Sequence, residues 1–481
     1  MNKIENILDD EEKFATLISP CYGDPKNRDV LSGGWIHRDF FQKDDECVKA
    51  DDGQLYIRGG PRYHIALDNI SVKACIITCG GLCPGINVVI REIIMALRYN
   101  YGVSEIYGIK WGFLGLSDPK KYWIKLTPED VKEIHILGGT VLGTSRVQFN
   151  PDEAASTLIE NKVNMLFFIG GDGTHRGITE LSKSLKKIIK ERNKKEKIIL
   201  AGIPKSVDND LPIIDKSFGV ESAIQCSVRT IRAANVEANC NLNGIGIVKL
   251  FGRQSGYLAM LSSLAARDVN ICLVPEIPFN LYKENGLLDF ILERIKVKEH
   301  CVIVVSEGAK SSLKDYKDSE GKPKDIEDIG MVLSKEIKNH SEIKGIEVNI
   351  KYIDLSILGR GVPANEYDCN LCAKLAESAV HCAFAGFTNF SVGTINDKPC
   401  MIPLEKLNGS VIRKVEYNSD NYLMLLASTG QPSFYHEESE NNKDKSEKKK
   451  KTKNDTKENI DDDEYDKLGD KNFLKFRKKS T

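Results

Sequence analysis

Long apolar runs are absent from the 481-residue sequence, and so is an excess of charge of either sign. A helix that crosses a membrane needs roughly 18 or more consecutive apolar residues, and no run comes near that length. The 68 lysines and arginines balance 69 aspartates and glutamates, so no overall field favours nucleic acid or an anionic membrane. The acidic segment 1–20 has no apolar stretch of the secretory-signal type. We therefore expect a cytoplasmic protein without nucleic-acid or membrane partners.

The sequence also lacks a complete cysteine set for a structural zinc site. Its 13 cysteines are an odd number, scattered through apolar runs. Cys79 with Cys83 and Cys369 with Cys372 are closely spaced, but such a site needs four ligands and no second pair has matching spacing. We expect reduced thiols, as in a cytosolic protein.

From residue 72, short β-branched runs alternate with longer helical patterns. The alternation is typical of parallel sheets covered by helices on both faces. Its extent exceeds one small doubly wound sheet, so we expect an α/β protein with two such domains. The expected strands are 74–78, 165–169, 198–202, 245–250, 271–274, 301–305 and 348–353. The expected helices are 88–98, 174–191, 221–237, 257–266, 288–297, 332–339 and 370–385.

Both ends of the chain differ from this pattern. Residues 1–70 carry few periodic runs and read as an irregular N-terminal extension. Residues 437–481 have almost no apolar side chains and carry both charge signs. Such a segment buries too little surface to offset its ordering entropy, so we expect a disordered tail.

Glycine-rich turns follow two of the expected strands, where ligands bind in open α/β sheets. The first, TCGGLCPGIN at 78–87, lacks the GxGxxG spacing of a dinucleotide site and could be a plain strand-to-helix turn or a phosphate turn. The second, GGDGT at 170–174, places the carboxylate of Asp172 between two glycines. A carboxylate repels phosphate unless a divalent cation lies between them, and Mg²⁺ uses one or two carboxylates together with phosphate and water. We interpret Asp172 as a ligand of Mg²⁺ that in turn holds a nucleotide.

Charged motifs follow further expected strands. PKSVDND at 204–210 gathers Lys205, Ser206, Asp208 and Asp210, a set that suits phosphoryl transfer to an alcohol. A polar loop that caps a helix is the alternative for this motif. In KLFGRQSGY at 249–257, Arg253 offers planar, multi-donor binding of phosphate. VPE at 274–276 and ILGRG at 357–361 repeat the arrangement of a strand end followed by charge.

In this order, the motifs resemble those of the 6-phosphofructokinases, over about residues 58–432. The motifs are GG at 80–81, PGIN at 84–87, GTSR at 143–146, GGDGT, PKSVDND and GR at 252–253. RGGPR at 58–62, KYID at 351–354 and QPSF at 431–434 are similar to the ATP-dependent plant- and protist-type branch, which is related to pyrophosphate-dependent enzymes.

The resemblance implies two doubly wound Rossmann-like domains with the active site in the cleft between them. A phosphoryl-donor (ATP) domain would comprise 71–219 with 357–405, and a sugar-phosphate domain 220–356 with 406–436. It also implies a kinase that phosphorylates the C1 hydroxyl of fructose 6-phosphate with ATP and Mg²⁺, at the committed step of glycolysis, in a homo-oligomer (dimer or tetramer).

The resemblance also assigns roles to residues at matching positions. Asp208 matches the general base, with Arg253 and Lys205 acting on the transferred phosphoryl group, and Asp172 matches the magnesium ligand. The donor site would comprise Gly81, Arg146, Gly171, Asp172, Gly173 and Thr174. The sugar-phosphate site would comprise Ser206, Asp208, Asp210, Phe251, Gly252, Arg253, Glu276, Lys351 and Arg360.

The chain departs from the branch at several positions. Ser206 replaces threonine and keeps the hydroxyl. His175 replaces glutamine, and we expect a partly exposed residue at the start of a helix. Ile357 stands where the branch has an aromatic residue, and Gly359 replaces an apolar one. Ile357 cannot hydrogen-bond a sugar, so we expect weakened sugar affinity.

Three alternatives stay open. Pyrophosphate could be the donor, which Lys205 permits; Gly173 favours ATP, because pyrophosphate users typically carry aspartate there. NAD kinases and lipid kinases share GGDGT but lack the other motifs as a set. A degenerate paralogue could bind sugar phosphate without turnover or act as a regulatory subunit.

Overall fold

The computed structural model describes residues 4–6, 17–18, 42–43, 46–68, 71–145, 147–192, 198–282, 286–313, 326–408, 412–432 and 434. The expected disordered tail lies outside these residues. No helix of the described part is long and apolar enough to cross a membrane.

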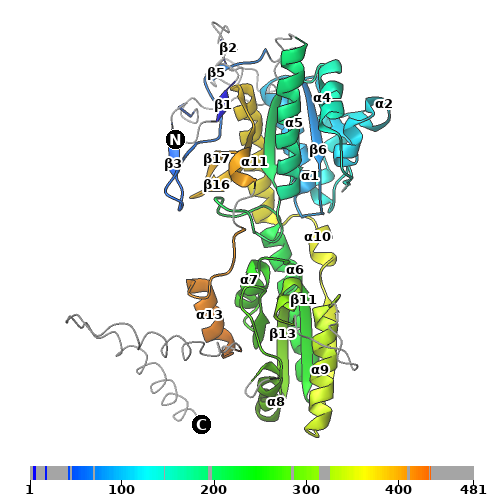
Figure 1. Cartoon of the computed structure of the whole chain (residues 1–481), viewed down its shortest axis with the longest axis vertical. Coiled ribbons are helices and arrows are strands. Elements are labelled where there is room, and N and C mark those ends of the chain that lie inside the picture. Colours follow the sequence, from blue (N-terminus) through cyan, green and yellow to red (C-terminus); the bar gives the residue numbers. More distant parts are fainter. Residues whose placement is uncertain are drawn as a thin grey trace, which may run out of the picture. The chain divides into compact units, whose positions relative to one another are not determined.

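The larger sheet has seven strands, of which the central ones are parallel. Figure 1 shows this sheet with its strands β6, β16 and β17 labelled. The two edge strands, β17 and β8, run antiparallel to their neighbours. In spatial order the strands are β17 (Lys398–Pro403), β16 (Phe390–Ile395), β10 (Ile199–Pro204), β9 (Met165–Gly170), β6 (Lys73–Thr78), β7 (Glu105–Ile109) and β8 (Trp123–Lys125).

Helices cover both faces of this sheet because successive strand residues point to opposite sides. Ile76 and Phe167 pack in the core with α1 (Ile86–Met95) and α11 (Glu366–Phe384). Their neighbours Ile77 and Phe168 pack on the other side with α4 (Pro151–Glu160) and α5 (Asp172–Glu191). In α5 an apolar stripe at helical spacing, Ile178, Leu181, Leu185 and Ile188, is buried against the sheet.

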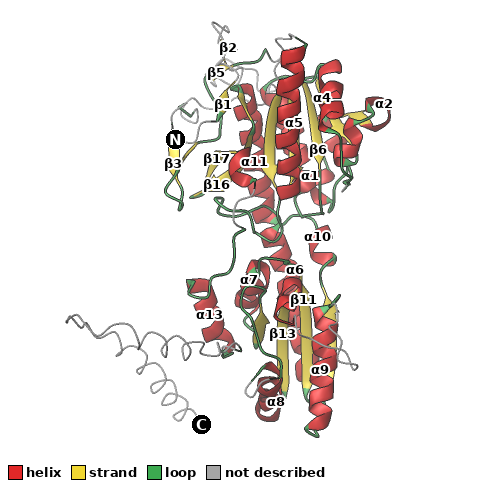
Figure 2. Cartoon of the chain, viewed as in Figure 1, coloured by secondary structure: helices red, strands yellow, loops and turns green. Residues whose placement is uncertain are grey.

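The smaller sheet has four strands, all parallel. Their spatial order is β12 (Ile271–Leu273), β13 (His300–Ser306), β11 (Gly244–Leu250) and β14 (Asn349–Asp354). One face packs with α8 (Leu287–Lys298) and α9 (Ile329–Ile343), and the other with α6 (Val220–Cys240) and α7 (Tyr257–Ala266), as Figure 2 shows in colour. The α/β fold of doubly wound, mainly parallel sheets predicted from the sequence is therefore confirmed.

Short elements complete the described chain. The two-stranded sheets pair β1 (Glu5–Asn6) with β15 (Phe387–Thr388), β2 (Leu17–Ile18) with β5 (His64–Ile65), and β3 (Cys47–Lys49) with β4 (Leu55–Ile57). The short helices are η4 (Ala96–Asn100), η5 (Gly112–Leu116), α2 (Pro119–Tyr122), α3 (Pro128–Val131), η6 (Ile134–Ile136), η7 (Glu307–Leu313), α10 (Leu358–Gly361) and α12 (Leu404–Leu407), followed by the longer α13 (Asp420–Thr429).

A buried polar contact joins α11 to α6. The Asp368 carboxylate accepts hydrogen bonds from the Ser222 amide at 2.7 Å and the Ser222 hydroxyl at 2.5 Å. Both sheets belong to one compact unit that extends to Tyr435, so the expected division into two domains stays a prediction.

Candidate functional site

Three of the predicted motifs follow the carboxyl ends of three neighbouring strands of the larger sheet. Strands β6, β9 and β10 are adjacent and parallel, so their carboxyl ends meet there. Gly80 and Gly81 follow β6, Gly171 follows β9 and Lys205 follows β10. The sheet order thus brings together segments that are far apart in the sequence.

A cavity of about 670 Å³ lies at this edge. Its glycines leave the backbone open, because a Cβ added at Gly173 would have no atom within 4 Å. Backbone amides at the N-terminus of α5 favour anions in such a position. The lining residues include Cys79, Gly80, Gly81, Phe113, Val147, Phe149, Gly171, Gly173, Thr174, Arg176, Gly177, Glu180 and Lys205. The cavity can therefore hold a phosphate-bearing ligand.

Asp172 is the first residue of α5 and is exposed beside this cavity. Its carboxylate pairs with Arg176 at 2.8 Å, one helical turn away. Among the described residues, no three His, Cys, Asp or Glu side chains gather as a metal site. A magnesium ion held by Asp172 would therefore take most of its ligands from phosphate and water, which suits this ion. Arg146, which the resemblance places in the donor site, lies outside the described residues.

Asp208 is half-buried and has an unused acceptor atom. Its Oδ1 atom is buried and has no hydrogen-bond partner among the described residues. Burial, with a contribution from the charge of Asp210, raises the pKa of Asp208 to about 6. Asn209 adopts a left-handed backbone with φ of 53° and accepts a hydrogen bond from the Ser217 amide, which shapes the loop around Asp208. A carboxylate of this kind can accept a proton from a ligand near neutral pH.

Three sequence neighbours of Asp208 belong to the same loop. Lys205 is buried, and burial lowers the pKa of its ammonium group. A Cβ added at Gly80 would lie 3.8 Å from its Nζ atom, so the lysine reaches the first glycine turn. Ser206 donates its hydroxyl to Asp210, so these two predicted contacts lie together.

The carboxyl ends of the smaller sheet contribute a second charged cluster. Glu307, which follows β13, pairs with Arg253 after β11 at 3.6 Å and with Arg360 on α10 at 4.0 Å. The Arg360 guanidinium lies 5.0 Å from the ring centre of buried Phe251. The Arg253 side chain is 83% exposed and is therefore free to reach a ligand. Gly252 has φ of 130°, and a Cβ there would lie 2.5 Å from the Ser255 carbonyl oxygen.

Asp208 interacts electrostatically with the charged cluster of the smaller sheet. The Arg360 guanidinium lowers the pKa of Asp208 and the Glu307 carboxylate raises it, although burial and Asp210 have the larger effects. Arg360 and Glu307 act on the same aspartate, and Arg253 pairs with Glu307, so these side chains form a polar site suited to a phosphorylated sugar.

Glu307 was not predicted, and Glu276 has other partners. The Glu276 carboxylate accepts hydrogen bonds from the Gly256 amide, at 2.9 and 3.1 Å, and from the Val415 amide, at 2.9 Å. These bonds cap α7 and hold the segment before α13.

Lys351 is exposed on the edge strand β14. In SEG at 306–308, Glu307 is a charged residue at the end of an expected strand, as Glu276 is in VPE. The criterion of a strand end followed by a charge could therefore have found Glu307.

The expectation for His175 was wrong. The residue lies in the first turn of α5 but is completely buried, because it is on the side of the helix that faces the sheet. Burial lowers the pKa of its imidazole to about 4.

The two departures after β14 differ in their surroundings. Ile357 is 84% exposed at the start of α10, three residues before Arg360. Gly359 is buried, and a Cβ there would lie 2.7 Å from the Phe251 ring. Glycine therefore allows α10 to approach the aromatic ring on which Arg360 stacks.

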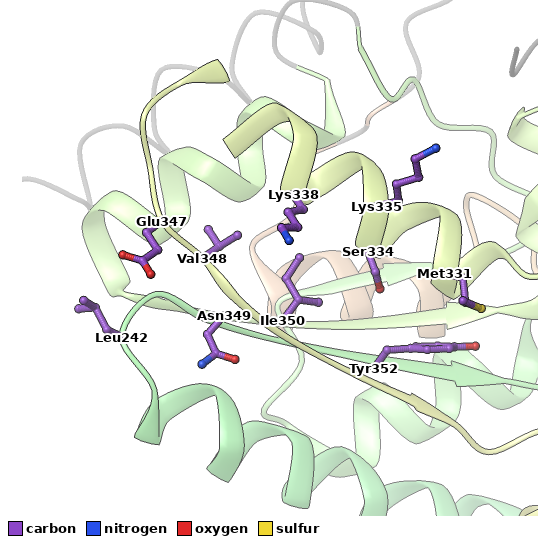
Figure 3. A pocket seen from close by; sticks show the side chains of 10 residues that line it. All are labelled: Leu242, Met331, Ser334, Lys335, Lys338, Glu347, Val348, Asn349, Ile350 and Tyr352. Atoms are coloured by element: carbon purple, nitrogen blue, oxygen red, sulfur yellow. The ribbon is translucent and has the colours of Figure 1, made fainter. Parts of the chain in front are cut away.

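A second cavity, of about 680 Å³, contains none of the predicted site residues (Figure 3). It is a groove between α9 and β14, and its lining includes Met331, Ser334 and Lys338 from the helix and Asn349, Ile350 and Tyr352 from the strand. Most of the predicted site residues lie at the carboxyl ends of the parallel strands instead.

Comparison with known proteins gives a consistent result. The family model described as phosphofructokinase matches residues 73–383. ATP-dependent 6-phosphofructokinase 1 of Arabidopsis thaliana is 43% identical over 89% of this chain and 92% of its own length. ATP-dependent 6-phosphofructokinase 7 of the same plant is 39% identical over 90% of this chain and 89% of its own length. The crystal structure of a pyrophosphate-dependent phosphofructokinase from Marinobacter aquaeolei has a similar fold, with a TM-score of 0.60, 19% identity, and coverage of 75% of this chain and 91% of that one.

Proposed function

Because the chain belongs to the phosphofructokinase family, we propose that it transfers the γ-phosphoryl group of ATP to the C1 hydroxyl of fructose 6-phosphate. The products are fructose 1,6-bisphosphate and ADP. The buried and unpartnered Oδ1 atom of the Asp208 carboxylate is the observation that carries the proposal, since Asp208 lies on the loop after β10 and its pKa responds to the charges of Arg360 and Glu307.

The donor binds in the cavity at the ends of β6, β9 and β10. The glycine backbones at 80–81 and 171–173 let phosphate approach the amides, and Thr174 and Lys205 complete the lining. Asp172 would hold Mg²⁺, which neutralises phosphate charge when bound. The remaining donor contacts that we propose are Gly81, Gly171, Gly173 and Arg146, the last of which lies outside the described residues.

Asp208 acts as the general base. It removes the proton of the C1 hydroxyl while that oxygen forms a bond to the γ-phosphorus and the bond to the bridging oxygen of ADP breaks. A base whose pKa lies near the working pH suits this step. Lys205 and Arg253 neutralise the charge that develops on the transferred group.

The sugar phosphate binds at the ends of the smaller sheet. Arg253, Arg360 and Glu307 offer charged partners. The Phe251 ring packs against Arg360, and Gly252 precedes Arg253 in the chain. Ser206 and Asp210 offer further contacts from the catalytic loop. Lys351, Glu276 and the homo-oligomeric state remain proposals from the resemblance alone. The cytoplasmic location remains a proposal from the composition of the sequence.

ATP is favoured over pyrophosphate by the shape of the donor cavity. Space around Gly173 is open, and the cavity continues along α5 to Gly177 and Glu180, past an aromatic pair of Phe113 and Phe149 with ring centres 4.1 Å apart. A donor made of phosphates alone would leave this apolar part unused.

The test is a coupled assay on the purified full chain with fructose 6-phosphate and either ATP or pyrophosphate. We expect fructose 1,6-bisphosphate with ATP and Mg²⁺, little with pyrophosphate, and none when a chelator removes divalent metal. Equal or faster turnover with pyrophosphate would reverse the donor assignment. No turnover with either donor, together with retained sugar-phosphate binding, would support the degenerate paralogue.

A further inference from the structure

His175 contacts the turn that forms the floor of the donor cavity. Gly171 is the N-cap of α5 and lines that cavity. Its carbonyl oxygen accepts the Thr174 amide at 2.9 Å and the His175 amide at 3.1 Å. The imidazole Nδ1 atom of His175 lies 2.8 Å from the same oxygen. The side chain therefore adds a third polar contact to one carbonyl.

The other side of the imidazole is anchored in the sheet. Its Nε2 atom lies 2.9 Å from the Ser391 hydroxyl on β16, and its ring packs edge-on against Phe168 of β9. Gly202 of β10 makes room for both, because a Cβ there would lie 2.4 Å from the Phe168 ring and 2.6 Å from Ser391 Oγ. Strands β9, β10 and β16 thus build a closed pocket for the ring.

The hydrogen bonds determine which nitrogen carries the proton. A carbonyl oxygen only accepts, so Nδ1 must carry the hydrogen and donate to Gly171. Nε2 then accepts from the Ser391 hydroxyl. Burial, which disfavours the charged form, keeps the ring in this neutral state.

Fixing the Gly171 carbonyl also fixes the amide of Asp172. A trans peptide is planar, and its C=O and N–H groups point in opposite directions. The Gly171 oxygen, which accepts the Thr174 and His175 amides, points along α5 toward the C-terminus, so the Asp172 N–H points out of the N-terminal end of the helix. Gly171 and Gly173 at that end line the donor cavity. The same peptide unit leads into the carboxylate that we assign to the metal.

We propose that His175 is a positioning residue for the phosphoryl donor, which aligns the Gly171–Asp172 peptide through the relay from Ser391. This inference rests on the proposed function, because the affected ligand is the Mg·ATP complex. The residue touches neither ATP nor the sugar. Its loss should weaken ATP binding and leave the sugar site unchanged.

The experiment compares His175→Phe with His175→Gln in the full chain. Phenylalanine keeps a ring in the pocket but has no donor for the Gly171 oxygen. Glutamine keeps one N–H donor and one acceptor. Loss of one such hydrogen bond corresponds to roughly a tenfold change in affinity. We expect KM for ATP to rise about tenfold in His175→Phe, with KM for fructose 6-phosphate unchanged, and to return most of the way in His175→Gln.

His381→Phe is the matched control for damage to the core. His381 is also buried and hydrogen-bonded, with Nδ1 2.8 Å from the Tyr101 hydroxyl, and burial lowers the pKa of its imidazole to about 4 as well. It does not line the donor cavity. We expect lower thermal stability but a parental KM for ATP.

Ser391→Ala provides a second route if His175→Phe does not fold. It removes the anchor of the ring and leaves the Nδ1 donor, so we expect a smaller rise of KM for ATP, about threefold. The parent is assayed first, so that failure of the proposed function is recognised separately as no turnover with ATP. If the parent turns over and the folded His175 and Ser391 variants keep its KM for ATP, or if both KM values rise together, the positioning role is refuted.

Discussion

Replacing Asp208 with asparagine separates the catalytic role of this residue from its contribution to stability. The substitution keeps the shape of the side chain and removes its charge and its basicity. General-base catalysis is worth roughly 10²- to 10⁴-fold, so kcat should fall by about that factor while KM for ATP changes little. In the parent, the rate should also fall as the pH drops through about 6 and the base becomes protonated.

The same substitution should stabilise the fold. The pKa of Asp208 rises from 3.8 to about 6 in the folded protein, mainly by burial. The folded state therefore binds this proton more tightly than the unfolded state, and stability falls as the pH rises from about 4 through about 6. At 1.36 kcal/mol for each pKa unit, the ionised carboxylate costs about 3 kcal/mol above that range. Asp208→Asn should recover this amount at pH 7.5 and little of it near pH 4.

The assay pairs kcat with the thermal unfolding midpoint at pH 7.5 and pH 4.5. Asp215→Asn is a control. The Asp215 carboxylate accepts hydrogen bonds from the Asn396 and Asp397 amides, so this variant should be less stable than the parent and should keep its kcat. A variant of Asp208 with near-parental kcat would remove the residue from catalysis. A variant that is inactive but no more stable at pH 7.5 would show that burial does not perturb this carboxylate.

Four further substitutions test the donor and sugar sites. Gly173→Asp should raise KM for ATP about tenfold, because a charged side chain would enter the open donor cavity, and should impair pyrophosphate use less; an unchanged KM for ATP would refute the steric reason for choosing ATP. Ile357→Tyr should lower KM for fructose 6-phosphate about 5-fold or more and leave KM for ATP unchanged, since it supplies a hydroxyl at an exposed position near Arg360; no change would mean that this position does not face the sugar. Glu307→Gln should raise KM for the sugar about tenfold, whereas Glu276→Gln should mainly lower the unfolding temperature, and the reverse result would restore Glu276 as the sugar contact.

Strands β6, β9 and β10 were predictable because parallel strands buried on both faces are continuous apolar runs. Met165–Gly170 is such a run, and every residue in it is buried. Strands β16 and β17 were missed although Asn396 and Asp397, both with positive φ, form a turn of the hairpin type between them. Strand β7 was missed because Gly108 interrupts a short run that contains two half-buried side chains.

The site was predictable at the level of motifs and less so at the level of contacts. The order of β10, β9 and β6 makes neighbours of three motifs that the sequence separates, as the rule for parallel sheets suggests. Glu276 and Glu307 follow strand ends in the same way, and only their surroundings distinguish a helix cap from an arginine partner. The burial of His175 depends on Ser391, which is 216 residues further along the chain, so no local pattern could reveal it.

The position of β16 in the sequence has a consequence for biosynthesis. Residues 199–204 of β10 pair on one side with β9, which precedes them, but on the other side with β16, which begins at Phe390. A ribosome adding about 5 to 20 residues per second would take roughly 10 to 40 s to reach that strand. During this interval the nascent sheet has an apolar edge without its partner, the kind of edge that pairs with other chains. The residues of the smaller sheet lie between β10 and β16 in the chain and are synthesised during this interval. Strand β10 would therefore need protection by chaperones until β16 has emerged from the ribosome.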